Sequence, residues 1–265
     1  LVSLLSHESA SVVTPALRCL GNFVSGSDRQ TQAVVDAGVL DKITGLLASS
    51  KKTIKKETCW LLSNIAAGTR MQIASLIAMP QVLSVVIHYA QTAEWEIRKE
   101  ATWVVSNIAT MGSGHQVKRL VELGAIDAIC SILDITDARI CLVALDAMES
   151  ILKSGSQLGL TTYPTLVDEA DGLEKLESLQ GHANVDIYEK SIALLETYFG
   201  VEDEVEDENL APVVTGNTFG FGVQEKAFEW TGSAEDEAKW SGALGDEALT
   251  PALQPFSFNA NNMNM

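Results

Sequence analysis

The sequence lacks the residue clusters that metal sites and disulfide frameworks need. Its four cysteines, Cys19, Cys59, Cys130 and Cys141, are widely spaced and lie in apolar, helix-like contexts. They therefore form neither a CxxC site nor an obvious disulfide framework. The four histidines show no HExxH or His/Cys spacing. We expect no metal, no cofactor and a reducing compartment, either cytosol or nucleus.

Basic residues are scarce as well. The chain carries 35 aspartates and glutamates against 18 lysines and arginines, which gives a formal net charge of −17. The excess is concentrated in residues 201–265, which hold 13 acidic side chains and only two lysines. Phosphate binding needs a positive surface, so this balance argues against nucleic acid as the main partner. It suits a basic ligand, although solubility alone would explain the charge equally well.

Long apolar runs are also missing. No run of 18 apolar residues occurs, and the first residues lack the basic region, apolar stretch and cleavage site of a signal peptide. The sequence thus predicts no membrane or secretory role. Leu1–Leu5 resemble the middle of an apolar helix, so we expect the chain to be a fragment of a longer protein.

What the sequence does contain is an internal repeat, and such a repeat decides the expected fold. The run KKETCWLLSNIA at residues 55–66 returns 43 residues later as RKEATWVVSNIA at 98–109. An earlier copy retains the asparagine as Asn22 and has Arg18 in place of the tryptophan. In the copy that follows, both residues are lost and Asp146 takes the tryptophan position.

Glycines recur in phase with this repeat. Gly38, Gly124 and Gly172 each follow a short helix-like segment, and we expect each to close a helix in the left-handed conformation. Pro80 takes this place in the intervening unit and breaks the helix by a different mechanism. The sequence of each unit then predicts three helices, for example over 30–37, 39–48 and 53–67.

Three helices in roughly 42 residues are typical of armadillo repeats. One such unit cannot bury its apolar face alone, so neighbouring units must stack. The sequence therefore predicts an all-α, right-handed superhelical armadillo-repeat solenoid over residues 1–200, with a partial first repeat, three whole repeats and a capping repeat. Residues 201–265 are acidic and rich in Gly, Ala and Asn, and we expect a disordered acidic tail.

The repeated tryptophan and asparagine indicate a ligand-binding face. Positions three and four apart share a helix face, so Glu57, Trp60 and Asn64 form one stripe and the residues 43 positions later form its copy. A simpler interpretation is an interlocking ladder without a ligand, but recurrence in register favours binding. An asparagine amide can pair with the N–H and C=O of an extended peptide, and indole faces can hold Lys or Arg stems. Glu57, Glu100 and Asp28 would meet the charged heads, which predicts an extended, Lys- or Arg-rich peptide.

In these runs, and over about residues 1–200, the sequence closely resembles the importin-α family. The resemblance implies a piece that begins within the sixth of ten armadillo repeats and carries the minor of two sites for nuclear-localisation peptides. It implies a nuclear import adaptor that shuttles between cytoplasm and nucleus. It also implies peptide contacts from Arg18, Asn22, Val24, Asp28, Thr31, Lys56, Glu57, Trp60, Ser63, Asn64, Glu100, Trp103 and Asn107.

The resemblance also implies partners. Cargo proteins would bind through their nuclear-localisation signals. The last repeat, with Asp168–Phe199 and the acidic run after it, would contact the export receptor and nucleoporins. Binding of importin-β and the major peptide site would belong to segments that precede this piece.

Two other functions stay open. A scaffold of the β-catenin kind shares the fold but binds acidic partners through a basic groove, and Glu57 and Glu100 speak against it. A subunit of an enzyme could use the solenoid as a passive frame, yet no GxxxxGK(S/T) or GxSxG pattern occurs. We therefore expect no enzymatic activity.

Overall fold

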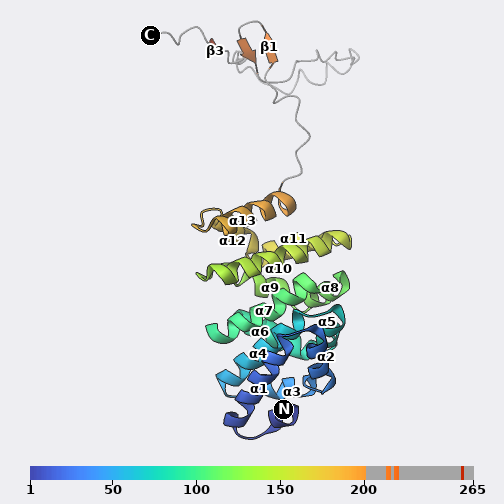
Figure 1. The fold of residues 1–265 in the computed structure, drawn as a ribbon. Coiled ribbons are helices and arrows are strands. Elements are labelled where there is room, and N and C mark those ends of the chain that lie inside the picture. The colour runs from blue at the N-terminus through green and yellow to red at the C-terminus, as the bar shows by residue number, and fades with distance from the viewer. Residues whose placement is uncertain (201–212, 216–217, 221–257, 260–265) are drawn as a thin grey trace, which may run out of the picture. The chain divides into compact units, whose positions relative to one another are not determined.

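The computed structural model describes residues 1–200 together with short strands at 213–215, 218–220 and 258–259 (Figure 1). The chain divides into two compact units, Leu1–Gly200 and Val201–Met265. In the first unit, helices from successive parts of the sequence lie side by side in a stack (Figure 1). After a 3-10 helix, η1 (Val2–Ser6), its α-helices are α1 (Ala10–Val24), α2 (Asp28–Asp36), α3 (Leu40–Leu47), α4 (Lys52–Ala66), α5 (Arg70–Ile77), α6 (Pro80–Thr92), α7 (Trp95–Met111), α8 (Gly114–Glu122), α9 (Ala125–Cys130), α10 (Ala138–Gln157), α11 (Thr162–Glu169), α12 (Gly172–Leu179) and α13 (Val185–Tyr198).

The helices group into three-helix units. The bounds of α2, α3 and α4 fall within two residues of the three ranges predicted for one unit. The helices α5–α7 and α8–α10 repeat this pattern, and the third helix of each unit is the longest. The third helices α1, α4, α7, α10 and α13 pack successively against one another. This arrangement confirms the all-α solenoid predicted for residues 1–200.

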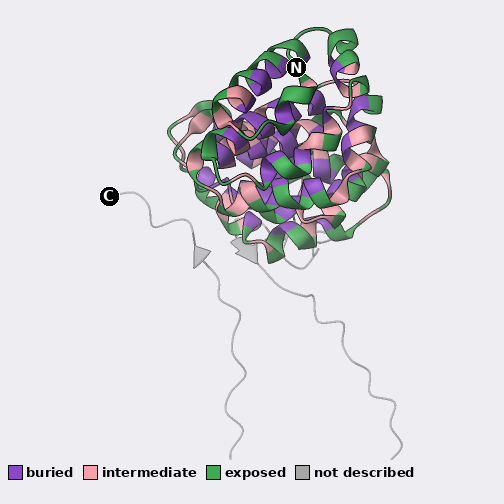
Figure 2. Cartoon of the chain, turned by 90° about the horizontal axis from the view of Figure 1, so that it is seen from below, coloured by how far each residue is buried: buried purple, intermediate pink, exposed green. Residues whose placement is uncertain are grey.

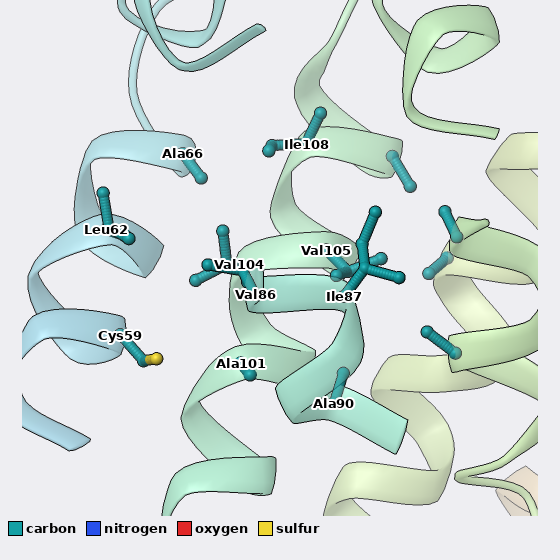
Figure 3. Close-up of a cluster of buried hydrophobic side chains, with 14 of the residues drawn as sticks. Cys59, Leu62, Ala66, Val86, Ile87, Ala90, Ala101, Val104, Val105 and Ile108 are labelled. Carbon is teal, nitrogen blue, oxygen red and sulfur yellow. The ribbon is translucent and has the colours of Figure 1, made fainter. Parts of the chain in front are cut away.

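Apolar side chains between these helices form the core. On α4, Leu61, Leu62 and Ile65 are at most 1% exposed, as the repeat pattern predicted. Figure 3 shows Leu62 gathered with Val104 of α7 and Val86 of α6 into one buried layer. Burying one such side chain stabilises the fold by about 1.5–3 kcal/mol. Figure 2 shows the buried residues in the middle of the first unit and the exposed ones around them.

A capping glutamine links each of two units to the unit before it. Capping boxes begin α2, α5 and α8, and each pairs a Ser or Thr with the glutamine three residues later. Gln72 Nε2 also donates to the Asp28 carbonyl oxygen at 2.9 Å, and Gln116 Nε2 donates to the Arg70 carbonyl oxygen at 2.8 Å. These glutamines thus cap their own helix and bind the preceding unit. Sequence reasoning missed this link, although the S/T-x-x-Q signal recurs at 27–30, 69–72 and 113–116.

The expectation for the phased glycines is confirmed at two positions and wrong at the third. Gly38 and Gly124 have φ angles of 81° and 94°, the left-handed conformation that glycine adopts without strain. In the third unit Asp171, with φ 56°, takes that conformation instead of Gly172. Gly172 is needed for space, because a Cβ there would lie 2.6 Å from Cys130 Sγ.

The described residues of the second unit form a small antiparallel sheet. Its strands, β1 (Val213–Thr215), β2 (Thr218–Gly220) and β3 (Phe258–Asn259), pair in that order. The sequence predicted no strand in this region. The rest of the disordered tail predicted over 201–265 lies outside the described residues.

Among the described helices, none is by itself long and apolar enough to cross a membrane, whereas α5 and α6, bent by 92° at their junction, together reach that length and composition.

Gln72→Ala removes both sets of hydrogen bonds that one linking glutamine makes. Gln72 is 1% exposed, so water cannot readily replace its side chain. We expect the free energy of unfolding, measured by urea denaturation, to fall by about 1–3 kcal/mol. The control is Gln81→Ala at an exposed position of α6, which should change stability by no more than about 0.5 kcal/mol. Equal losses in the two variants would contradict the linking role.

Candidate peptide-binding groove

Two adjacent helices carry the repeated tryptophan and asparagine. Trp60 and Asn64 lie on α4, Trp103 and Asn107 lie on α7, and the two helices pack directly against each other. All four residues are of intermediate exposure, whereas the neighbouring apolar positions of both helices are buried. The shared core of α4 and α7 therefore holds the two pairs in register.

A pocket of about 270 Å³ opens beside Trp60. Its walls come from α1, α4 and α7, the third helices of three successive units. Six of the residues expected to contact a peptide line it: Arg18, Asn22, Lys56, Glu57, Trp60 and Glu100. The structure thus brings residues that are up to two repeats apart together around one indole ring.

One carboxylate of the pocket is already paired. Arg18 Nε donates to Glu57 Oε1 at 2.9 Å, and Glu57 is only 5% exposed. Glu57 was expected to meet the charged head of a ligand side chain. In this structure Arg18, the residue that replaces the tryptophan of the first copy, holds it instead.

Glu100 forms no ion pair among the residues that the structure describes. Burial raises its pKa above the ordinary value, with a partial opposing effect of Lys99 and Lys56 and a further upward effect of Glu57 and Glu96. A cation placed in the pocket would favour the ionised form. Glu100 is therefore the pocket carboxylate best placed to receive positive charge.

Trp60 lies against a glycine that sequence reasoning missed. A Cβ on Gly21 would lie 2.1 Å from Trp60 Cζ3, so the indole fills the space of the missing side chain. Gly21 precedes Asn22, whereas the later copies have Ser63 and Ser106 before their asparagines. The glycine that replaces serine before the asparagine of the first copy was the sequence signal for this contact with Trp60.

The two repeated asparagines differ in their hydrogen bonding. Asn107 Nδ2 donates to the Ser63 carbonyl oxygen at 2.9 Å, which ties α7 to α4. Asn64 Nδ2 is buried and has no hydrogen-bond partner among the described residues. Because an unpaired buried donor is costly, Asn64 has more to gain than Asn107 from an added acceptor.

Trp103 has a cation of the chain itself over its ring. The guanidinium carbon of Arg139, in the first turn of α10, lies 5.6 Å from the Trp103 ring centroid. This distance is within the range of a cation–π interaction. The chain thus uses on Trp103 the same chemistry that the sequence predicted for a ligand.

Seven of the thirteen expected contact residues do not line the pocket: Asn64, Trp103 and Asn107, described above, and Val24, Asp28, Thr31 and Ser63. Val24 and Thr31 are each 3% exposed, and the Thr31 hydroxyl donates to the Val24 carbonyl oxygen at 3.1 Å. Ser63 is 5% exposed, and its hydroxyl donates to the Trp60 carbonyl oxygen at 2.9 Å. Asp28 is exposed, but it begins α2 and lies outside the pocket. Its expected role beside the charged heads therefore has no counterpart there.

The cysteines are free thiols. Burial raises the pKa of Cys59 and Cys130 to about 12 and that of Cys141 to about 11. These three thiols therefore stay protonated at neutral pH. Within the described part of the chain, no group of three or more His, Cys, Asp or Glu side chains is arranged to hold a metal ion.

Comparison with known proteins connects this geometry with one family. The Armadillo/beta-catenin-like repeat model matches residues 27–67, and the atypical Arm repeat model matches residues 161–213. Importin subunit alpha-1b of Oryza sativa subsp. japonica is 44% identical over 85% of this chain and 43% of its own length. Importin subunit alpha-4 of Arabidopsis thaliana is 44% identical over 77% of this chain and 39% of its own length. The chain belongs to the importin-α family.

This importin-α chain spans less than half the length of those two relatives. Among solved structures, it resembles a designed armadillo repeat protein in complex with the peptide (KR)4. The TM-score is 0.67 at 31% identity, over 74% of this chain and 80% of the designed one. A second designed armadillo repeat protein gives 0.66 at 28% identity with the same coverage. These similarities confirm the armadillo-repeat solenoid.

Gly21→Ala tests whether this glycine makes room for Trp60. The added methyl group must displace the indole, so we expect the free energy of unfolding to fall by about 1–3 kcal/mol and the Trp60 indole NMR signal to move. Gly45→Ala is the matched control, because a Cβ at this helical position meets nothing within 4 Å. That control should be neutral or stabilising by about 0.4–1 kcal/mol. A Gly21→Ala variant as stable as the Gly45→Ala variant, with an unmoved Trp60 signal, would refute the space requirement.

Proposed function

We propose that this importin-α chain is a nuclear import adaptor that binds extended, Lys/Arg-rich nuclear-localisation peptides. The observation that carries the proposal is the tryptophan–asparagine pair, repeated 43 residues apart on two helices that pack together. The pocket at the first pair adds carboxylates to an aromatic face. This combination suits a long basic side chain, whose stem is apolar and whose head is charged.

The spacing of the helices supports an extended ligand. Packed helices lie roughly 8–10 Å apart, and an extended peptide advances about 3.3 Å per residue. Asn64 and Asn107 would therefore meet the peptide main chain about every two or three residues. Asn64 offers a donor that lacks a partner among the described residues. Because this donor is buried, the Asn64 amide would have to rotate outward before a peptide carbonyl oxygen could supply the missing acceptor. The peptide carbonyl would do so regardless of the side chain that its residue carries.

The pocket supports basic side chains. A Lys or Arg stem lying on Trp60 would gain a cation–π interaction of about 0.5–2 kcal/mol. Its head would reach Glu100, whose ionised form is disfavoured by burial while no cation is bound. The proposed side-chain contacts are thus Arg18, Asn22, Lys56, Glu57, Trp60, Asn64, Glu100, Trp103 and Asn107. The buried Val24, Thr31 and Ser63 would contribute main-chain groups or support, and Asp28 would lie at the margin.

The comparisons point the same way. The curated relatives are importin α subunits, and the designed armadillo protein was solved with a peptide of alternating Lys and Arg. We infer that this chain is an adaptor that does not catalyse a reaction. We also infer that it shuttles between cytoplasm and nucleus. Contacts with the export receptor and nucleoporins would involve Asp168–Phe199, and importin-β would bind the whole receptor through a segment outside this chain.

Titration of fluorescently labelled (KR)4 with the full chain, followed by anisotropy, tests the proposal. We expect saturable binding, and no binding of an acidic (DE)4 control. The double variant Asn64→Ala with Asn107→Ala should weaken binding by about tenfold to a hundredfold, because two main-chain hydrogen bonds are lost. Its matched control removes two amides from α6, Gln81→Ala with Gln91→Ala, and should bind like the unmodified chain.

Circular dichroism of both double variants checks that the helices persist. Unchanged affinity in the asparagine variant would exclude the asparagine ladder as the binding mechanism. Preference for the acidic peptide would instead support a scaffold of the β-catenin kind.

A further inference from the structure

The arginine over Trp103 occupies a defined place in the repeat. Arg139 follows Glu96 by 43 residues, the same interval that separates Trp103 from Trp60. Each of the two positions lies in the first turn of a third helix. Glu96 and Arg139 are therefore equivalent positions of successive units, and they carry opposite charges.

Both positions reach back to the preceding third helix. Glu96 Oε2 lies 3.8 Å from Lys56 Nζ on α4, and Glu96 is not among the residues that line the pocket at Trp60. Arg139 instead places its guanidinium over the ring of Trp103 on α7. At Trp60 the two cations of the pocket are held by carboxylates, Arg18 by Glu57 and Lys56 by Glu96. At Trp103 the cation lies over the indole itself.

The contact with the ring is the main constraint on Arg139. Arg139 is exposed, and among the described residues its guanidinium forms neither an ion pair nor a hydrogen bond. The acidic residue one repeat after Trp103, Asp146, is paired with Lys190 of α13. The guanidinium is therefore free to leave the indole when a competing cation arrives.

We propose that Arg139 is a built-in competitor, an intramolecular cation that occupies the Trp103 indole until a basic peptide side chain displaces it. The inference rests on the proposed function. It makes Arg139 a specificity-determining residue: the pocket at Trp60 accepts a Lys or Arg directly, whereas the Trp103 face accepts one only at the expense of the internal contact. A peptide whose only basic side chain lies in the pocket at Trp60 would therefore bind almost as tightly as a longer peptide with basic side chains at both Trp60 and Trp103.

Affinity of the full chain for labelled (KR)4 tests the proposal. An extended octapeptide is about 26 Å long, enough to cover both tryptophans. Arg139→Gln removes the competitor, and we expect binding about 3- to 10-fold tighter. Lys153→Gln is the matched control: it removes the same charge from a nearly identical face of α10, about four turns away. This variant should bind within about twofold of the unmodified chain, because ionic screening weakens a charge at that distance.

A second readout follows Arg139 directly. The ring current of Trp103 shifts the Arg139 Nε–Hε NMR signal, which is assigned by its loss in Arg139→Gln. Saturating (KR)4 should move this signal to its position in a Trp103→Leu variant. A signal that stays in place with peptide bound would overturn the displacement.

The outcomes separate this inference from the proposed function. If the unmodified chain binds (KR)4 and the Arg139 and Lys153 variants respond equally, or Arg139→Gln binds more weakly, only the competitor role is wrong. If neither the unmodified chain nor Arg139→Gln binds (KR)4, the proposed function fails and the competitor role fails with it.

Discussion

Packing of each third helix against the next is the interaction on which the rest of the structure depends. Leu62 of α4 and Val104 of α7 lie in one buried layer (Figure 3), and a slip of one residue would turn the apolar rows away from each other. The same register places Trp60 and Trp103 at equivalent points of adjacent helices. The position of the pocket beside Trp60 therefore follows from the core, because side chains that cannot enter the buried layer must line its edge.

Polar contacts between units then give each interface a different character. Between α1 and α4, Arg18 holds Glu57, and between α10 and α13, Lys190 holds Asp146. Between them lies Glu100, a half-buried carboxylate whose pKa is raised by burial, so that a nearby cation would favour its ionised form. The interfaces of a regular solenoid thus differ in their charge pairing without any change in the helices.

The sequence was sufficient for the architecture because a 43-residue repeat exposes the helix period and the core rows directly. The sequence also identified the tryptophans and asparagines as a candidate binding face, because polar and aromatic residues that share a helix face and recur in register are not needed for an apolar core. Contacts between repeats could not be read in the same way. The pairing of Arg18 with Glu57, the space that Gly21 leaves for Trp60 and the reach of Arg139 all depend on how side chains from different units meet in three dimensions.

The most direct test of the groove is the set of tryptophan indole N–H signals in a two-dimensional ¹H–¹⁵N NMR titration with (KR)4. The chain has five tryptophans, and Trp→Phe variants assign each signal. We expect the signals of Trp60 and Trp103 to shift together and saturate at one peptide concentration, while that of Trp95 stays in place. Shifts confined to tryptophans other than Trp60 and Trp103 would contradict a basic-peptide groove at α4 and α7.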